Sequence, residues 1–381
     1  MPAPPPDRGP LFVFVTEDPE RDWPIVAPHV MYTSNSNAEW AKERGSGSPP
    51  YPPVSSIEDL QSSPQFAVVT PDQEHGNMTA ANDRVIIEVG LNENQRRDAN
   101  PHVPYSPEEI GDDARRCWEA GAAIVHFHAR DPKSGAPRLT DPTLNIDTMR
   151  AIQSRTDLIA HPTFTNDPMP EGYRHVVEGI EQPDVRWELG HGDLNAPSVD
   201  DLQWRLDFCR DHGLRVKSAL FNAGHVQLLR HVLASGWLVA DPLLLQFTMG
   251  PPGAWDLNDA SSRRQPGMQV AGREMAASFT TPATLTSLHF LLSQLSDLPI
   301  EWMPLVYLAD QFQMATLAIA LGGHVRVGIG DYAYQDRGAP SNAELVEHVV
   351  AIARAYGREP ASTEEARAIF GIRDRAAATA S

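Results

Sequence analysis

The chain has 381 residues and a formal net charge of -19 at pH 7, so neither a nucleic-acid backbone nor an anionic membrane surface is expected as its main partner. The sequence contains no apolar run long enough to span a bilayer, and its Pro-rich start lacks the apolar core of a signal peptide. Two cysteines support no disulfide framework, and we therefore expect a protein of the reducing cytosol.

Residues 1–80 differ in composition from the rest of the chain. They are rich in Pro, Ser, Asn and Gly, most densely at 45–53. Such a composition rarely makes an independent core. We therefore interpret residues 1–80 as a Pro/Ser-rich N-terminal extension, in which two short apolar pieces, 11–15 and 66–69, could be strands or docking segments.

From residue 84 onward, short apolar or β-branched runs alternate with helical stretches. The runs are 85–91, 123–128, 158–163, 185–189, 215–221, 243–247, 300–306 and 324–329. Helix starts are marked as well: Ser106-Pro107-Glu108-Glu109 combines an N-cap serine, an early proline and a glutamate three residues after the cap. This alternation predicts parallel strands joined by crossover helices.

Eight strand–helix repeats over about 280 residues are what a (β/α)8 TIM barrel requires. The structural competitor is a doubly wound open sheet, but no Gly-x-Gly-x-x-Gly turn follows the first run. We therefore predict an α/β fold in which residues 81–381 form a (β/α)8 barrel catalytic domain.

The stretch from Val125 to Pro132 concentrates the polar chemistry of the sequence. Residues two apart on a strand point to the same face, so His126 and His128 lie together with Arg130 next in line. Two imidazoles so placed can bind one divalent metal ion at about 2.0–2.1 Å per nitrogen. The alternative is a pair of core histidines bonded to backbone, and the position at a strand end favours the metal.

In a barrel the active site is built at the C-terminal ends of the strands. Five of the 14 histidines fall at these ends, and imidazole with carboxylate is the ligand set of zinc or a similar divalent ion. The candidate residues there are Glu93, His126, His128, Arg130, His161, Thr163, His191, Asp193, Asn222, Arg326 and Asp331.

Several stretches of this sequence resemble the β-keto acid cleavage enzyme family, in the family's own order from residue 84 to about 371. They are Val125-His126-Phe127-His128-Ala129-Arg130-Asp131, Gly322-Gly323-His324-Val325-Arg326-Val327-Gly328, and residues 101–110, 246–253 and 357–363. The resemblance implies a (β/α)8 barrel, usually a homo-oligomer, with zinc at the strand ends. It also implies a retro-Claisen reaction in which a β-keto acid and acetyl-CoA give acetoacetate and an acyl-CoA.

The resemblance assigns roles to particular residues. His126 and His128 match the family's zinc-binding histidines, Arg326 its catalytic arginine and Asp331 the carboxylate used for acid–base work. Further matches, both expected to be catalytic, are Glu93 for a strand-one glutamate and Thr163 for a strand-three serine. The sequence also departs from the family pattern at three positions: Gly330 stands where a glutamate completes the zinc site, Asp193 where a threonine is expected, and Ala219 near an expected glutamate.

Because of these departures, several assignments stay open. The third metal ligand is Asp331, His191, His161 or Glu93. Substrate contacts are expected from Asp193, His191, Asn222 and Arg130, although Arg130 could instead pair with Asp131 to fix its loop. Two further functions remain possible alternatives: a CoA-independent metal-dependent aldolase or hydrolase on the same barrel, and a catalytically altered homologue that binds a metabolite.

Overall fold

The computed structural model of the chain describes residues 12–15, 18–43, 54–61, 66–69, 83–93, 95–165, 167–238, 242–250 and 280–372. The chain divides into two units, residues 1–81 and residues 82–381. Most of the predicted loop 249–280, with residues 251–253 of the motif at 246–253, lies outside the described residues.

The N-terminal unit combines a strand pair with helices. β1 (Phe12–Val15) pairs in parallel with β2 (Phe66–Val69), so both apolar pieces singled out in the sequence are strands. Between them lie α1 (Pro19–Glu43) and α2 (Ile57–Gln61), and a small apolar cluster is centred on Ala27, Val54 and Leu60. The long helix α1 was not predicted, because Pro24 and Pro28 lie inside it and proline normally interrupts a helix.

The second unit is the predicted barrel, and its strands run parallel. They are β4 (Ile87–Gly90), β5 (Ile124–Phe127), β6 (Ile159–Pro162), β7 (Leu189–His191), β8 (Arg215–Leu220), β9 (Leu243–Gly250), β11 (Ile300–Val306) and β12 (Val325–Val327). Ladders join β4 to β5, β5 to β6, β7 to β8, β8 to β9, β9 to β11 and β12 to β4. The His324 amide donates to the Trp302 carbonyl at 2.8 Å and links β12 to β11.

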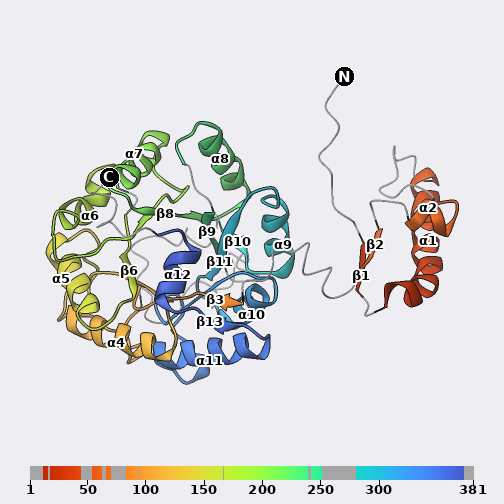
Figure 1. Cartoon of the computed structure of the whole chain (residues 1–381). Helices are drawn as coiled ribbons and strands as arrows, with labels where there is room; N and C mark the ends of the chain where they lie inside the picture. Colours follow the sequence, from red (N-terminus) through yellow and green to blue (C-terminus); the bar gives the residue numbers. More distant parts are fainter. Residues whose placement is uncertain are drawn as a thin grey trace. The chain divides into compact units, whose positions relative to one another are not determined.

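One helix follows each strand and lies on the outside of the ring (Figure 1). The helices are α4 (Pro107–Ala120), α5 (Pro142–Gln153), α6 (Arg174–Gly179), α7 (Val199–Asp211), α8 (Ala223–Ala234), α9 (Leu285–Ser293), α10 (Phe312–Ala320) and α11 (Asn342–Ala355). Ser106 and Ser341 form capping boxes with Glu109 and Glu344, as the sequence predicts. No helix in the described part of the chain has both the length and the apolar character needed to cross a bilayer.

The fourth strand lies later in the chain than predicted. Its hydrogen-bonded part is Leu189–His191 rather than 185–189, because Val185 and Trp187 pack into the core outside the barrel. Glu188 therefore begins the strand instead of ending it, and it pairs with Arg367 of α12 (Thr363–Ile369). This removes Glu188 from the active end of the barrel.

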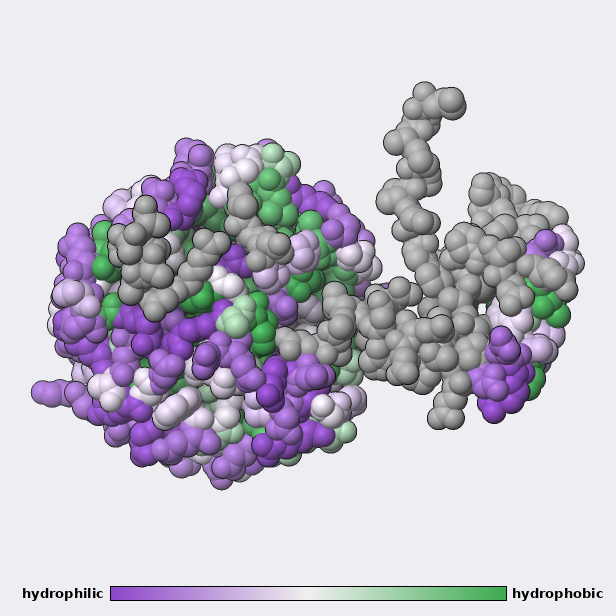
Figure 2. Space-filling view, viewed as in Figure 1, coloured by the Kyte–Doolittle hydropathy of each residue, from purple (hydrophilic) through white to green (hydrophobic). Residues whose placement is uncertain are grey.

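The opposite end of the barrel is closed by apolar side chains. α12 crosses the centre of the ring in Figure 1, and Ala366 and Phe370 pack on the interior apolar residues Ile86, Ile124, Ile159, Leu189, Leu244 and Met303. β3 (Arg84–Val85) and β13 (Glu359–Pro360) pair beside this closure. The visible outer face of the unit is mainly hydrophilic (Figure 2). The polar part of the barrel interior therefore lies toward the C-terminal ends of the strands.

Candidate active site

The barrel interior changes from apolar to polar within two residues along the strands. Side chains two apart share a face of a strand, so the apolar layer is followed by a buried polar one. Its members are Glu88, His126, His161, His191, Lys217, Gln246 and Arg326. The alternation thus brings polar side chains from seven strands, six of them ionisable, into one cross-section of the barrel directly below the mouth.

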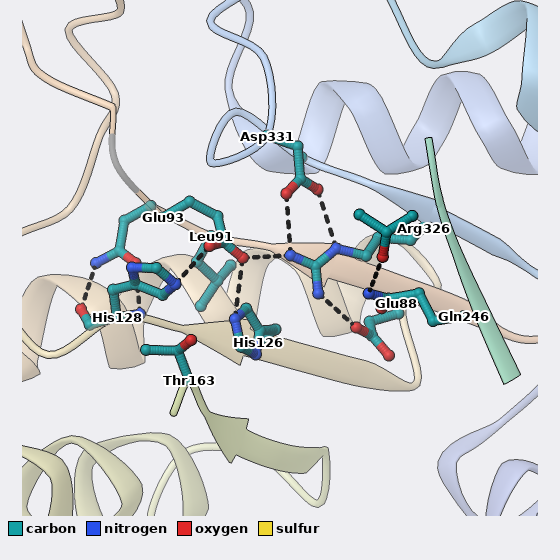
Figure 3. A network of polar contacts seen from close by, with 12 residues as sticks. Glu88, Leu91, Glu93, His126, His128, Thr163, Gln246, Arg326 and Asp331 are labelled. Carbon is teal, nitrogen blue, oxygen red and sulfur yellow. Dashed lines mark hydrogen bonds and ion pairs between the residues drawn. The ribbon is translucent and has the colours of Figure 1, made fainter. Parts of the chain in front are cut away.

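Glu93, His126 and His128 meet at the mouth of the barrel (Figure 3). Glu93 Oε1 lies 3.0 Å from His126 Nε2, and its other carboxylate oxygen contacts His128 Nε2. All three side chains are at least nine-tenths buried. Two imidazole nitrogens and one carboxylate therefore converge on a single point. The sequence alone did not single out this carboxylate, because Glu93 was one of several possible third ligands.

Arg326 connects this group to two further carboxylates. Its Nη1 donates to Glu88 Oε1 at 2.7 Å, and Nε and Nη2 donate to the two Asp331 oxygens at 3.0 Å each. Nη2 also donates to Glu93 Oε1. Figure 3 shows the guanidinium between Glu93, Asp331 and Glu88. A single cation thus orients three buried acids, a role that a mobile surface arginine could not fill.

Lys217 and Glu88 form a second buried ion pair, and neither residue was singled out in the sequence. Lys217 Nζ lies 2.7 and 2.8 Å from the two Glu88 oxygens and 3.2 Å from Gln246 Oε1. A fourth neighbour of the ammonium group, His161 Nε2, lies 3.4 Å away. The sequence did contain a signal for this pair. A lysine or glutamate inside an apolar strand run is almost never buried without a partner, so both positions could have been flagged.

Three histidines form a chain behind the mouth. His161 Nδ1 lies 3.2 Å from His126 Nδ1 and 2.7 Å from His191 Nε2, and His191 Nδ1 lies 3.5 Å from Asp193 Oδ1. A histidine that binds a metal through Nε2 carries its proton on Nδ1 and donates it to an acceptor behind it. His161 is placed to be that acceptor for His126.

The loop after β4 is fixed by two buried polar side chains. Asn92 accepts the His128 amide at 2.8 Å and donates to the carbonyl oxygens of His128 and Pro104. Arg130 donates to the carbonyls of Asn92 (2.9 Å), Glu93 and Gly135. Asp131 instead accepts from Ser134, so Arg130 holds the Glu93 loop rather than pairing with Asp131.

The remaining predicted residues lie at different depths. Thr163 follows β6 and is partly exposed, and its side chain lies near His126 and His128 (Figure 3). Asp193 keeps 23% of its side chain exposed and accepts the Ala219 amide. Asn222 caps α8 by accepting the Gly224 amide at 2.9 Å, so its side chain already has a structural task. The structure thus brings Glu93, His126, His128, Arg326 and Asp331 together and places Asn222 at a helix terminus.

The network separates the pKa values of its carboxyl groups. Burial opposes ionisation, yet the neighbouring His128, His126 and Arg326 hold the pKa of Glu93 well below its usual range. Lys217 does the same for the pKa of Glu88 against a similar burial penalty. Burial raises the pKa of Asp331, and the charge of Glu93 adds to this despite Arg326. Asp331 is therefore the carboxyl of this network best suited to carry a proton.

The donor atoms fit a divalent cation. Two groups of possible ligands share His126: Glu93 with His126 and His128, and His126 with His161 and His191. Only the first contains an anionic ligand, and Lys217 Nζ lies 3.4 Å from His161 Nε2, beside the second. A neighbouring ammonium disfavours a cation, whereas two imidazoles with a carboxylate are a zinc ligand set. The first group is the better metal site.

The lowered pKa values of two buried histidines predict that the stability of the protein falls with pH. Burial lowers the pKa of His175 to about 4 and that of His126 to about 3. An unfolded histidine titrates near 6.5, so the unfolded chain binds more protons between these values and stability falls as pH drops from 6.5 to 4. His175 alone contributes on the order of 3 kcal/mol. Urea unfolding of the metal-free protein at pH 7, 6 and 5 should show this loss, with a smaller slope in His175→Gln; equal stability at all three pH values would contradict it.

The fold and this cluster define a (β/α)8-barrel enzyme whose buried ionisable centre lies at the C-terminal ends of the strands. The sequence model of the beta-keto acid cleavage enzyme family matches residues 84–372. The chain therefore belongs to the beta-keto acid cleavage enzyme family, and the resemblance inferred from its motifs is confirmed.

Individual relatives agree with this assignment. The chain is 26% identical over 285 residues to the 3-keto-5-aminohexanoate cleavage enzyme of Acetoanaerobium sticklandii, covering 72% of this chain and 93% of that protein. It is 26% identical over 298 residues to the 3-dehydrocarnitine:acetyl-CoA trimethylamine transferase of Rhizobium meliloti, covering 70% and 89%. The structure of ObcA in complex with oxaloacetate has a TM-score of 0.55 at 18% identity, covering 72% of this chain and 68% of that one, which supports the fold.

Proposed function

We propose that this chain cleaves a β-keto acid with acetyl-CoA in a divalent-metal-dependent reaction, with zinc as the expected ion. The acetyl group joins the carboxymethyl carbon of the β-keto acid to give acetoacetate, and the remaining acyl group is transferred to CoA. The observation that carries the proposal is the convergence of Glu93, His126 and His128 beside the Arg326–Asp331 pair. Family membership and the acetyl-CoA named for one relative support it.

The residues present divide the task between them. His126 and His128 hold the ion together with one carboxylate. A bound divalent ion supplies a Lewis acid that polarises a ketone oxygen. Arg326 places a positive charge where negative charge develops on the substrate, which is effective because its side chain is buried. Asp331, whose pKa is raised, removes and returns a proton at the carboxymethyl carbon of the β-keto acid.

Turnover of a panel of β-keto acids with and without acetyl-CoA tests this proposal. We expect an acyl-CoA and acetoacetate to appear together, in equal amounts, and only when acetyl-CoA is present. Cleavage without acetyl-CoA would instead support a metal-dependent aldolase or hydrolase. A folded, metal-free protein without turnover would support a metabolite-binding role.

We also propose that the protein is a homo-oligomer, as the family resemblance implies. We propose the cytosol as its location, because the cysteine usage favours a reducing compartment. Sedimentation velocity of the purified full chain and fractionation of its native cells test these two points, and a monomer or an exported protein would contradict them.

A further inference from the structure

Glu93 and residue 330 compete for the same space. A Cβ atom on Gly330 would lie 2.5 Å from Glu93 Cγ, 2.8 Å from the Gly90 carbonyl oxygen and 2.9 Å from the Glu93 amide nitrogen. The Gly330 amide donates to the Gly90 carbonyl at 2.9 Å, which fixes the two backbones at this separation. A side chain at 330 and the present Glu93 side chain therefore exclude each other.

Glycine at 330 is required for space and not for backbone conformation. Gly330 is absent from the described glycines with positive φ, whereas Gly328, two residues earlier, has a φ of 150°. An alanine could adopt the φ of residue 330, but its Cβ would collide with the Glu93 side chain and with the Gly90 carbonyl oxygen. What glycine supplies here is the missing side chain.

Glu93 is held in this space from the opposite side. Its φ of 29° lies in the left-handed region, which is unusual for a residue with a side chain. The Arg130 guanidinium, 2% exposed as a residue, donates to the carbonyls of both Glu93 and Asn92 and holds the loop. The carboxylate then reaches His126 and His128 at once. A strained backbone maintained by a buried arginine is typical of a functional position.

We infer that Glu93 is the third metal ligand, and that the absence of a side chain at Gly330 leaves room for its carboxylate to reach both histidines. The inference rests on the proposed metal-dependent function. It moves Glu93 from the predicted catalytic residues to the metal site and leaves Asp331 as the proton-carrying carboxyl.

The test measures Zn²⁺ affinity of the full-length, metal-stripped protein by competition with a chelating dye. Glu93→Gln keeps the shape but removes the charge, and we expect its affinity to fall on the order of 100-fold or more. Gly330→Ala should weaken binding about 10-fold or more by displacing Glu93.

Gly111→Ala is the matched control, because a Cβ there would lie 2.9 Å from the Ala151 carbonyl oxygen, between α4 and α5 and away from the site. It should lose stability yet keep Zn²⁺ affinity. Wild-type affinity in Glu93→Gln, or in a folded Gly330→Ala variant, would overturn the inference while leaving the function intact. Wild-type protein that binds no Zn²⁺ would instead overturn the proposed metal dependence.

Discussion

Replacing Arg326 with alanine is expected to lower the free energy of unfolding by about 3–5 kcal/mol, because Glu88, Glu93 and Asp331 would lose their shared buried cation. Turnover should fall roughly 10²–10³-fold beyond any loss of folded protein, since the group that balances developing charge is removed. Denaturant unfolding and kcat of the folded fraction measure the two effects separately.

Arg326→Lys separates charge from geometry. A lysine keeps the positive charge but cannot donate to both Asp331 oxygens and to Glu88 in one plane, so we expect partial recovery of stability and little recovery of turnover. Arg150→Ala is a control at a solvent-exposed pair with Asp184, where little stability is at stake. An Arg326→Ala variant as stable and as active as the wild type would show that the network is not essential.

His126→Ala should abolish both metal binding and turnover. His126 is shared by the two candidate ligand groups, so its loss leaves neither of them complete. We expect the metal content to fall from about one ion per chain to near zero and turnover to drop at least 10³-fold. Elemental analysis of the purified variant, with circular dichroism to confirm folding, provides the measurement.

A buried histidine outside the site provides the matched control. His324 lies on the apolar side of the barrel, where Nε2 contacts Glu301 at 2.9 Å and Nδ1 accepts the Ile86 amide. His324→Gln should be less stable but keep its metal and its turnover. If His126→Ala retained wild-type turnover, the site would lie elsewhere in the chain.

Much of the barrel could be predicted from the sequence, because its strands are buried apolar runs and its helices start at recognisable caps such as Ser106 and Ser341. The exceptions have physical causes. Val185 and Trp187 are apolar because they pack outside the barrel. Their apolar character placed the predicted fourth strand too early in the chain. Helix α1 forms despite Pro24 and Pro28, so its composition concealed it.

The site was harder to predict beyond its histidines. His126 and His128 are neighbours in sequence, so strand geometry alone brings them together. Lys217 and Glu88 are 129 residues apart, and their pairing depends on closing the barrel. Glu93 becomes a partner of both histidines only through a left-handed loop residue held by Arg130. The Glu93 side chain also fills the space beside Gly330, a contact that no local sequence pattern reveals.

The most direct test of the central claim is a crystal structure of the zinc-loaded protein with anomalous data collected above and below the zinc edge. We predict one strong anomalous peak, at about 2.0–2.2 Å from Nε2 of His126, Nε2 of His128 and a Glu93 carboxylate oxygen. A peak among His126, His161 and His191 instead, or no peak in the barrel mouth, would contradict the assignment.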